Sequence, residues 1–139
     1  MRTAGWTTAI IAGGWLGTMV GYVLTFAVLT AVRSPELGPD GTVEEQASGM
    51  STVMVFLAHT AIVGTMVGSG AVLAVGRAGL GRLTAAVVAA LGPLALIATG
   101  MLLLYFRSGI TLEVMLWDSA AAIAGTALGI YLGAARRRP

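Results

Sequence analysis

The sequence predicts an all-α integral membrane protein with four antiparallel transmembrane helices and both termini in the cytoplasm. Hydrophobic residues make up 57% of the 139 residues and charged residues only 10%, whereas a soluble domain carries about 25% charged residues. Four long apolar stretches each approach or exceed the roughly 20 residues that cross a hydrocarbon core. We therefore expect a single transmembrane domain over residues 1–139.

The four predicted spans are bounded by arginines and joined, with one exception, by short connections. They cover about residues 5–32, 49–76, 83–106 and 110–134. Short connections make sequential helices antiparallel neighbours, and the one long connection, residues 33–48, is predicted to be an outer loop. The first apolar run is far longer than the roughly 7–15 residues of a signal-peptide core, which favours a helix that stays in the membrane.

The basic residues predict the orientation of the chain. All eight are arginines, with six on one side of the predicted spans and two on the other. The six are Arg2, Arg77, Arg82, Arg136, Arg137 and Arg138, and the two are Arg33 and Arg107. Because basic residues gather on the cytoplasmic side, both termini are expected there. Arginine without lysine, together with abundant Ala, Gly, Val and Leu, is typical of GC-rich bacteria and favours a bacterial inner membrane.

Composition and spacing exclude several classes of function. The net charge of +2 does not indicate nucleic-acid binding, because the arginines flank the spans and form no basic face. The absence of cysteine excludes disulfides, thiolate metal sites and cysteine nucleophiles. With one histidine, no nucleophile–base spacing and no glycine-rich phosphate loop, the sequence does not favour an enzyme.

Glycines at four-residue spacing predict the helix-packing faces. Lipid supplies no hydrophobic drive for helices to associate, so small residues that allow close backbone approach mark contact surfaces. The predicted packing glycines are Gly13, Gly17 and Gly21 in the first span, Gly64 and Gly68 in the second, and Gly125, Gly129 and Gly133 in the fourth. These faces can be used inside one bundle, or one of them can contact a second chain.

The third span contains Gly92-Pro93 near its centre. A proline inside a helix leaves the carbonyl four residues earlier without its partner and usually kinks the helix. We expect a bend at Pro93, which can be fixed or can act as a hinge.

The intramembrane polar residues are predicted to lie at one depth. With the helix directions above, His59 and Asp118 each lie roughly 6 Å outward of the middle of their spans. Tyr22 and Thr99 reach a similar level from the first and third spans. The four predicted helices thus each contribute one polar group to a layer in the outer half of the membrane.

We interpret His59 and Asp118 as a hydrogen-bonded or ionic pair. A carboxylate at this depth is expensive unless it is paired or protonated, and its default interpretation is functional. Asp118 also shares a helix face with Gly125 and Gly129, so it should point into a protein contact. The alternative is that His59 bonds a backbone carbonyl or a threonine while Asp118 is protonated or close to the membrane surface.

Cofactor binding is a weaker alternative for the same region. His59 could ligate a haem iron, and Met50, Met54, His59 and Met115 are weak candidates for a copper(I) site because copper(I) prefers soft ligands. Methionine is common filler in apolar spans, so neither haem nor copper is predicted.

Three classes of function remain from the sequence alone. The first is a packing or assembly subunit that contacts lipid and other membrane subunits, or further copies of itself, through the glycine faces. The second is an oligomeric transporter or channel for a small solute, ion or proton that uses His59 and Asp118. The third is a haem- or copper-binding membrane subunit. The glycine faces and the near absence of extramembrane mass favour the first.

Overall fold

The computed structural model describes residues 2–32, 46–109 and 111–135, and nearly all of them lie in four α-helices. The helices are α1 (Arg2–Val32), α2 (Gln46–Gly76), α3 (Arg82–Ser108) and α4 (Leu112–Ala135). All four are long and apolar enough to cross a membrane, which confirms this part of the prediction. Most of the predicted outer loop, residues 33–45, lies outside the described residues.

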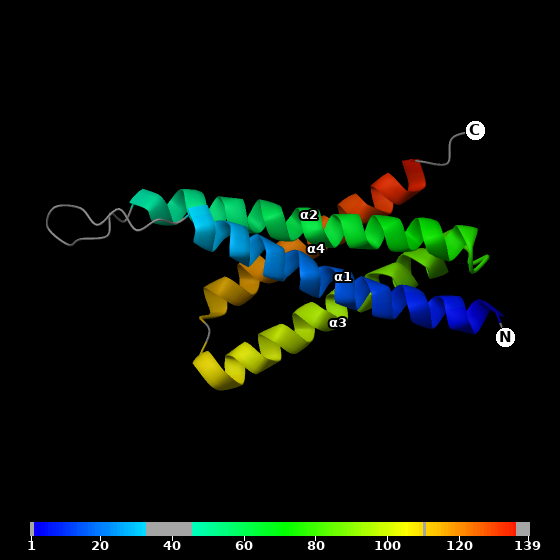
Figure 1. The fold of residues 1–139 in the computed structure, drawn as a ribbon, viewed down its shortest axis with the longest axis horizontal. Coiled ribbons are helices and arrows are strands. Elements are labelled where there is room, and N and C mark those ends of the chain that lie inside the picture. Colours follow the sequence, from blue (N-terminus) through cyan, green and yellow to red (C-terminus); the bar gives the residue numbers. More distant parts are fainter. Residues whose placement is uncertain (1, 33–45, 110, 136–139) are drawn as a thin grey trace, which may run out of the picture.

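Successive helices run in opposite directions, so the start of α1 and the end of α4 lie at the same end of the bundle (Figure 1). Two glycines with left-handed backbone close the ends of helices. Gly79, with φ of 67°, follows α2, and Gly109, with φ of 59°, caps α3. Residues with a side chain rarely adopt such φ values. These two positions allow the chain to turn back at opposite ends of α3.

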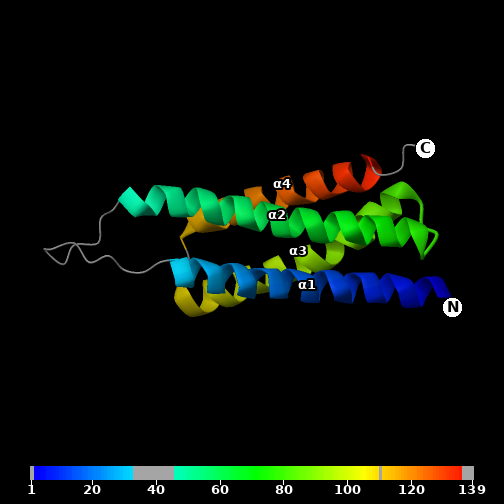
Figure 2. The ribbon, with the colours of Figure 1, turned by 45° about the horizontal axis from the view of Figure 1, so that its top comes forward.

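Helix α2 is the centre of the arrangement, because it contacts each of the other three helices. Helices α1 and α3 run parallel and pack together, as do α2 and α4 (Figure 2). By contrast, α3 and α4 touch only sparsely, and within the described residues α1 and α4 do not come into contact. The bundle therefore consists of two parallel pairs that meet along α2.

The predicted glycine faces of α2 and α4 pack against each other. A Cβ atom on Gly125 would lie 2.7 Å from the Thr60 carbonyl oxygen, and one on Gly129 would lie 2.6 Å from that of Gly64. In the opposite direction, a Cβ on Gly64 or Gly68 would lie 3.2 Å from a backbone oxygen of α4. The glycines thus allow the two backbones to approach closely within one chain.

The packing of α1 differs in part from the prediction. A Cβ on Gly17 would meet Met66 and one on Gly21 would meet Ile62, whereas Gly13 has nothing within 4 Å. The contact glycine in this part of α1 is its neighbour Gly14, whose Cβ would lie 3.0 Å from Cδ of Pro93. A four-residue repeat drifts around a helix of 3.6 residues per turn, which moves Gly13 away from the contact face.

Pro93 is fully buried, and α3 continues through it without interruption. The adjacent Gly92 lies against the backbone of α1, because a Cβ there would come within 2.8 Å of the Trp15 nitrogen. Gly92-Pro93 therefore forms the close contact between α3 and α1.

Small side chains fill the middle of the bundle. Val63 and Val67 are completely buried and pack with Ala89 and Ala90 of α3. A second cluster joins Ile10, Ala74, Ala85 and Val88. The far end of α3 is exposed instead, from Leu102 to Phe106, and in Figure 1 this end lies apart from α1 and α2. The bundle is thus tight in the middle and open at one end.

The α2–α4 contact predicts that alanine substitutions at two glycines differ sharply in their effect on stability. Gly129→Ala should destabilise the protein by about 1–3 kcal/mol, because the new methyl group would overlap backbone atoms of α2 that cannot move independently. Gly100→Ala, at a position with open space around it, is the matched control and should cause no loss. Thermal unfolding of both variants in detergent measures the difference, and equal stability would contradict the contact.

Candidate functional site

His59 is the most buried ionisable side chain of the described residues, with 5% of its surface exposed. It lies on α2, which packs against each of the other three helices. A buried imidazole is costly unless both ring nitrogens have partners. The structure supplies one partner from α1 and one from α4.

The partner from α1 is Tyr22. Its hydroxyl lies 2.7 Å from Nε2 of His59, which is a normal length for a strong hydrogen bond. The two rings meet edge to face, with centroids 5.1 Å apart and planes at 75°. Both the hydroxyl and the ring of Tyr22 therefore hold the imidazole in position.

The partner from α4 is Asp118. Its Oδ1 lies 3.5 Å from Nδ1 of His59, and its side chain is 38% exposed while that of His59 is 6% exposed. A carboxylate facing Nδ1 favours the tautomer with its proton on that nitrogen. Nε2 then accepts the hydrogen bond that the Tyr22 hydroxyl donates. The result is a directed chain from the phenol through the imidazole to the carboxylate.

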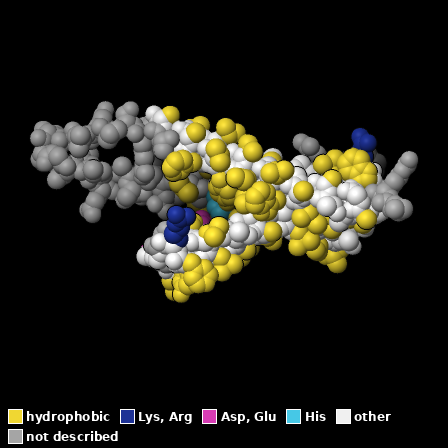
Figure 3. Space-filling view, turned by 60° about the horizontal axis from the view of Figure 1, so that its bottom comes forward, with side chains coloured by type: hydrophobic (Ala, Val, Ile, Leu, Met, Phe, Trp, Pro, Cys, Tyr) yellow, Lys and Arg dark blue, Asp and Glu magenta, His cyan; other side chains and the backbone are white. Residues whose placement is uncertain are grey.

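In this cluster, defined as Tyr22, His59 and Asp118, the histidine is buried and Asp118 is partly exposed. Figure 3 shows the histidine and an adjacent acidic side chain at the floor of a recess, with apolar side chains around it and a basic side chain nearby. Because the imidazole is enclosed, a molecule entering the recess would meet the carboxylate first. The recess lies toward the open end of the bundle.

Below the cluster the bundle is closed. Val63 is one helical turn further along α2 than His59, Val67 is two turns further, and both have 0% exposure. Within the described part of a single chain, these valines separate the cluster from the other end of the bundle. The cluster is therefore closed toward that end of the bundle.

Thr99, the fourth residue of the predicted polar layer, does not join the cluster. Its hydroxyl donates to the Ala95 carbonyl oxygen of its own helix at 2.8 Å, and the residue is exposed. A threonine in a helix can satisfy its hydroxyl in this way without any partner helix. The structure thus brings together three of the four layer residues.

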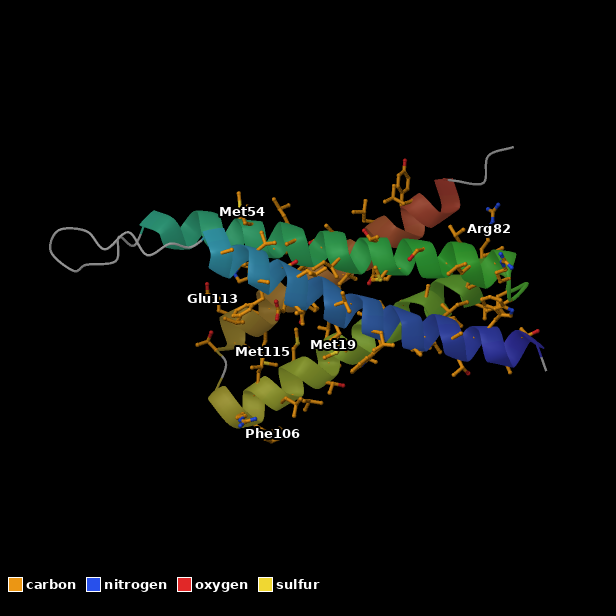
Figure 4. All side chains as sticks on the ribbon, viewed as in Figure 1. Met19, Met54, Arg82, Phe106, Glu113 and Met115 are labelled. Carbon is orange, nitrogen blue, oxygen red and sulfur yellow. The ribbon has the colours of Figure 1, made fainter. Side chains whose placement is uncertain are left out.

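Two of the methionines considered for copper, Met54 and Met115, do not lie together. Met54 is 57% exposed, and in Figure 4 it points away from the bundle, well apart from Met115. The side chain of Met50 lies outside the described residues. Both nitrogens of His59 already face partners, and no group of three His, Asp or Glu side chains that could hold a metal occurs among the described residues.

An aromatic pair lies beside the cluster and was missed by the sequence analysis. Phe56 of α2 and Trp117 of α4 meet edge to face, with centroids 5.7 Å apart. Trp117 directly precedes Asp118, and Phe56 lies one turn before His59 and Thr60 on α2. The signal available in the sequence was an aromatic residue close to each member of the predicted pair: Phe56 one turn before His59, and Trp117 directly before Asp118.

Comparison of the chain with protein-family models, with curated proteins and with solved structures gives no match. Inference about its role therefore depends on the cluster and on the packing around it.

The cluster predicts energetic coupling between His59 and Asp118. Each single variant, His59→Gln or Asp118→Asn, should destabilise the protein, because the remaining partner loses its counterpart in an apolar environment. The double variant should lose less than the two single losses combined, by at least about 0.5 kcal/mol. Thermal unfolding in detergent measures all four proteins, and strictly additive losses would show that the two side chains do not interact.

Proposed function

We propose that this chain is a subunit of an oligomeric membrane protein that carries protons, or a small solute together with protons, through the Tyr22–His59–Asp118 cluster. The observation that supports this proposal is a buried imidazole held between a phenol and a partly exposed carboxylate. A histidine can gain and lose a proton near neutral pH, and intramembrane carboxylates commonly mark ion or proton pathways.

The accessibility of Asp118 favours this role over a purely structural one. A cluster that served only to join helices would be best closed on all sides, since every exposed charge in lipid is costly. Here the carboxylate is 38% exposed while the histidine behind it is enclosed. In the alternative tautomer, which carries its proton on Nε2 and donates it to the Tyr22 oxygen, Nδ1 can take up a proton that arrives at Asp118, and the imidazole is then charged beside the carboxylate.

A single bundle does not provide a complete pathway, because Val63 and Val67 fill its middle. A route for protons or solute therefore has to run between subunits. This requirement connects the transport proposal with assembly, and the partner is either a second copy of the chain or another membrane subunit.

A role in assembly alone is the second candidate, and one surface favours it. Two grooves flank the exposed Ser69 on α2, one of about 240 Å³ toward α1 and one of about 370 Å³ toward α4. Gly13 lies in the first and has no neighbour within 4 Å, and Gly133 lies in the second. Because Gly64 and Gly68 already pack against α4, this candidate depends on the surface around Ser69.

We further propose that both termini face the cytoplasm, that the protein resides in a bacterial inner membrane, and that it is not an enzyme. The six-to-two division of the arginines supports this orientation. With this orientation, the cluster lies in the outer half of the membrane and its recess faces outward.

The transport proposal predicts proton flux that depends on Asp118. Liposomes containing the purified protein and a trapped pH dye should change internal pH faster than empty liposomes when a membrane potential is imposed. Asp118→Asn should reduce the rate at least tenfold, because the acceptor at the recess is lost. Glu113→Gln, which removes an exposed carboxylate from the same helix, should retain the rate. Flux that is unchanged in Asp118→Asn, or equal to that of empty liposomes, would contradict the proposal.

The orientation can be tested through the absence of native cysteine. Single variants Thr3→Cys and Gly41→Cys place one thiol near the N-terminus and one in the predicted outer loop. In intact cells, a membrane-impermeant maleimide should label only Gly41→Cys, whereas both should react after the membrane is permeabilised. Labelling of Thr3→Cys in intact cells would reverse the orientation.

A further inference from the structure

We propose that the recess beside Asp118 binds lipophilic organic cations that enter from the outer leaflet, and that such a cation and a proton on His59 exclude each other. The inference rests on the proposed function, since it names the substrate class of the same cluster. It follows from the charge of the cluster, the nature of its surroundings and the way the recess opens.

The cluster carries an incompletely compensated negative charge. When His59 is neutral, the carboxylate of Asp118 has a dipolar partner at 3.5 Å. No arginine of the described residues forms an ion pair with it, although a basic side chain lies near the recess (Figure 3). An unpaired carboxylate in an apolar medium favours any positive charge that can reach it. The exposed part of Asp118 is the place where a ligand's charge would be neutralised.

The surroundings favour an organic cation over a hydrated metal ion. A small metal ion must exchange its water shell for several oxygen or nitrogen ligands, and no group of three acidic or histidine side chains occurs in the described chain. A cation with its charge spread over apolar groups needs only one counter-charge and apolar or aromatic contacts. The recess has apolar sides (Figure 3), and the ring of Trp117, 53% exposed, is next to Asp118 in the chain.

The arrangement of α3 and α4 leaves a lateral way in. These two helices touch only sparsely, and the end of α3 that carries Leu102 to Phe106 lies apart from α1 and α2 (Figure 1). Toward the opposite end the cluster is closed by Val63 and Val67. A ligand dissolved in the outer leaflet can therefore approach Asp118 without crossing the packed middle.

Protonation of His59 should oppose binding of the cation. A charged imidazole 3.5 Å from Oδ1 would satisfy Asp118 internally. The other titratable group facing His59 is Tyr22 from α1. The titratable side chains of α3 lie at its two ends: Arg82 at the start, and Tyr105 and Arg107 near the end. None of these three forms an ion pair or hydrogen bond with His59 in the structure. Where His59 is mostly protonated, the apparent affinity should fall by up to about tenfold per unit decrease in pH.

The experiment measures binding of tetraphenylphosphonium to the full-length protein in detergent by isothermal titration calorimetry between pH 5 and pH 8. We expect saturable binding that weakens at low pH, and no binding of neutral triphenylphosphine oxide. Asp118→Asn should lower the affinity at least tenfold, whereas Glu113→Gln should leave it unchanged. Asp118→Glu, which keeps the charge, should retain most of the affinity, and His59→Gln should bind with little pH dependence. Thermal unfolding of each variant establishes that it is folded.

Several outcomes would overturn the inference. These are wild-type affinity in folded Asp118→Asn, loss of affinity in Asp118→Glu as large as in Asp118→Asn, equal binding of the neutral compound, or no binding by the wild type. Proton flux measured without the cation separates the two proposals. Asp118-dependent flux without tetraphenylphosphonium binding would reject the inference alone, and binding without flux would reject transport by this chain while leaving the site.

Discussion

Close backbone contact between α2 and α4 is the constraint on which the rest of the structure depends. In lipid these helices gain nothing from burying apolar side chains, so dispersion contacts at short range have to hold them together. Gly125 lies against Val63 and Gly129 against Val67, with Cβ positions 2.8 Å from the valine Cβ atoms. Any larger residue on α4 would force the helices apart, and the contact fixes their register as well as their distance.

That register also determines the site. When the same alignment of α4 with α2 is followed one to two turns toward the open end, Trp117 and Asp118 lie opposite Phe56. This agrees with the edge-to-face contact of Phe56 and Trp117. Helical side chains lean toward the N-terminus of their helix, so the imidazole of His59 reaches back along α2 to the level of Asp118. The glycines in the middle thus position two polar side chains that do not touch them.

Helix α1 completes the site through different contacts. Gly14 and Gly92 allow α1 and α3 to pack closely, and Gly17 and Gly21 accommodate Met66 and Ile62 of α2. Tyr22 follows directly after Gly21, and its hydroxyl reaches Nε2 of His59. The backbones of α1 and α4 stay apart within the described residues, and His59 links Tyr22 of α1 with Asp118 of α4.

The sequence was sufficient to predict the four helices, because the length of an apolar span is a local property. Matched depth alone selected Tyr22, His59 and Asp118, but it also selected Thr99, whose hydroxyl bonds within α3. Depth does not specify which way a side chain points around its helix. The contact of Gly14 with Pro93 was missed for a similar reason, since a strict four-residue repeat favours Gly13 and ignores the drift of the helix.

The position of the cluster at the boundary between tight and open packing explains how one small bundle can combine rigidity with access. The backbone contacts below His59 are short and involve atoms that cannot rotate away, so opening the bundle there would sacrifice most of the α2–α4 packing. Helices α3 and α4 touch only sparsely, and separating them further sacrifices little. The proposed exchange of a proton or cation at Asp118 would take place at the open end while the alignment of His59 with Asp118 is preserved. A site deeper in the bundle would lack access. A site further out would lack the apolar surroundings that strengthen the attraction between the Asp118 carboxylate and a positive charge.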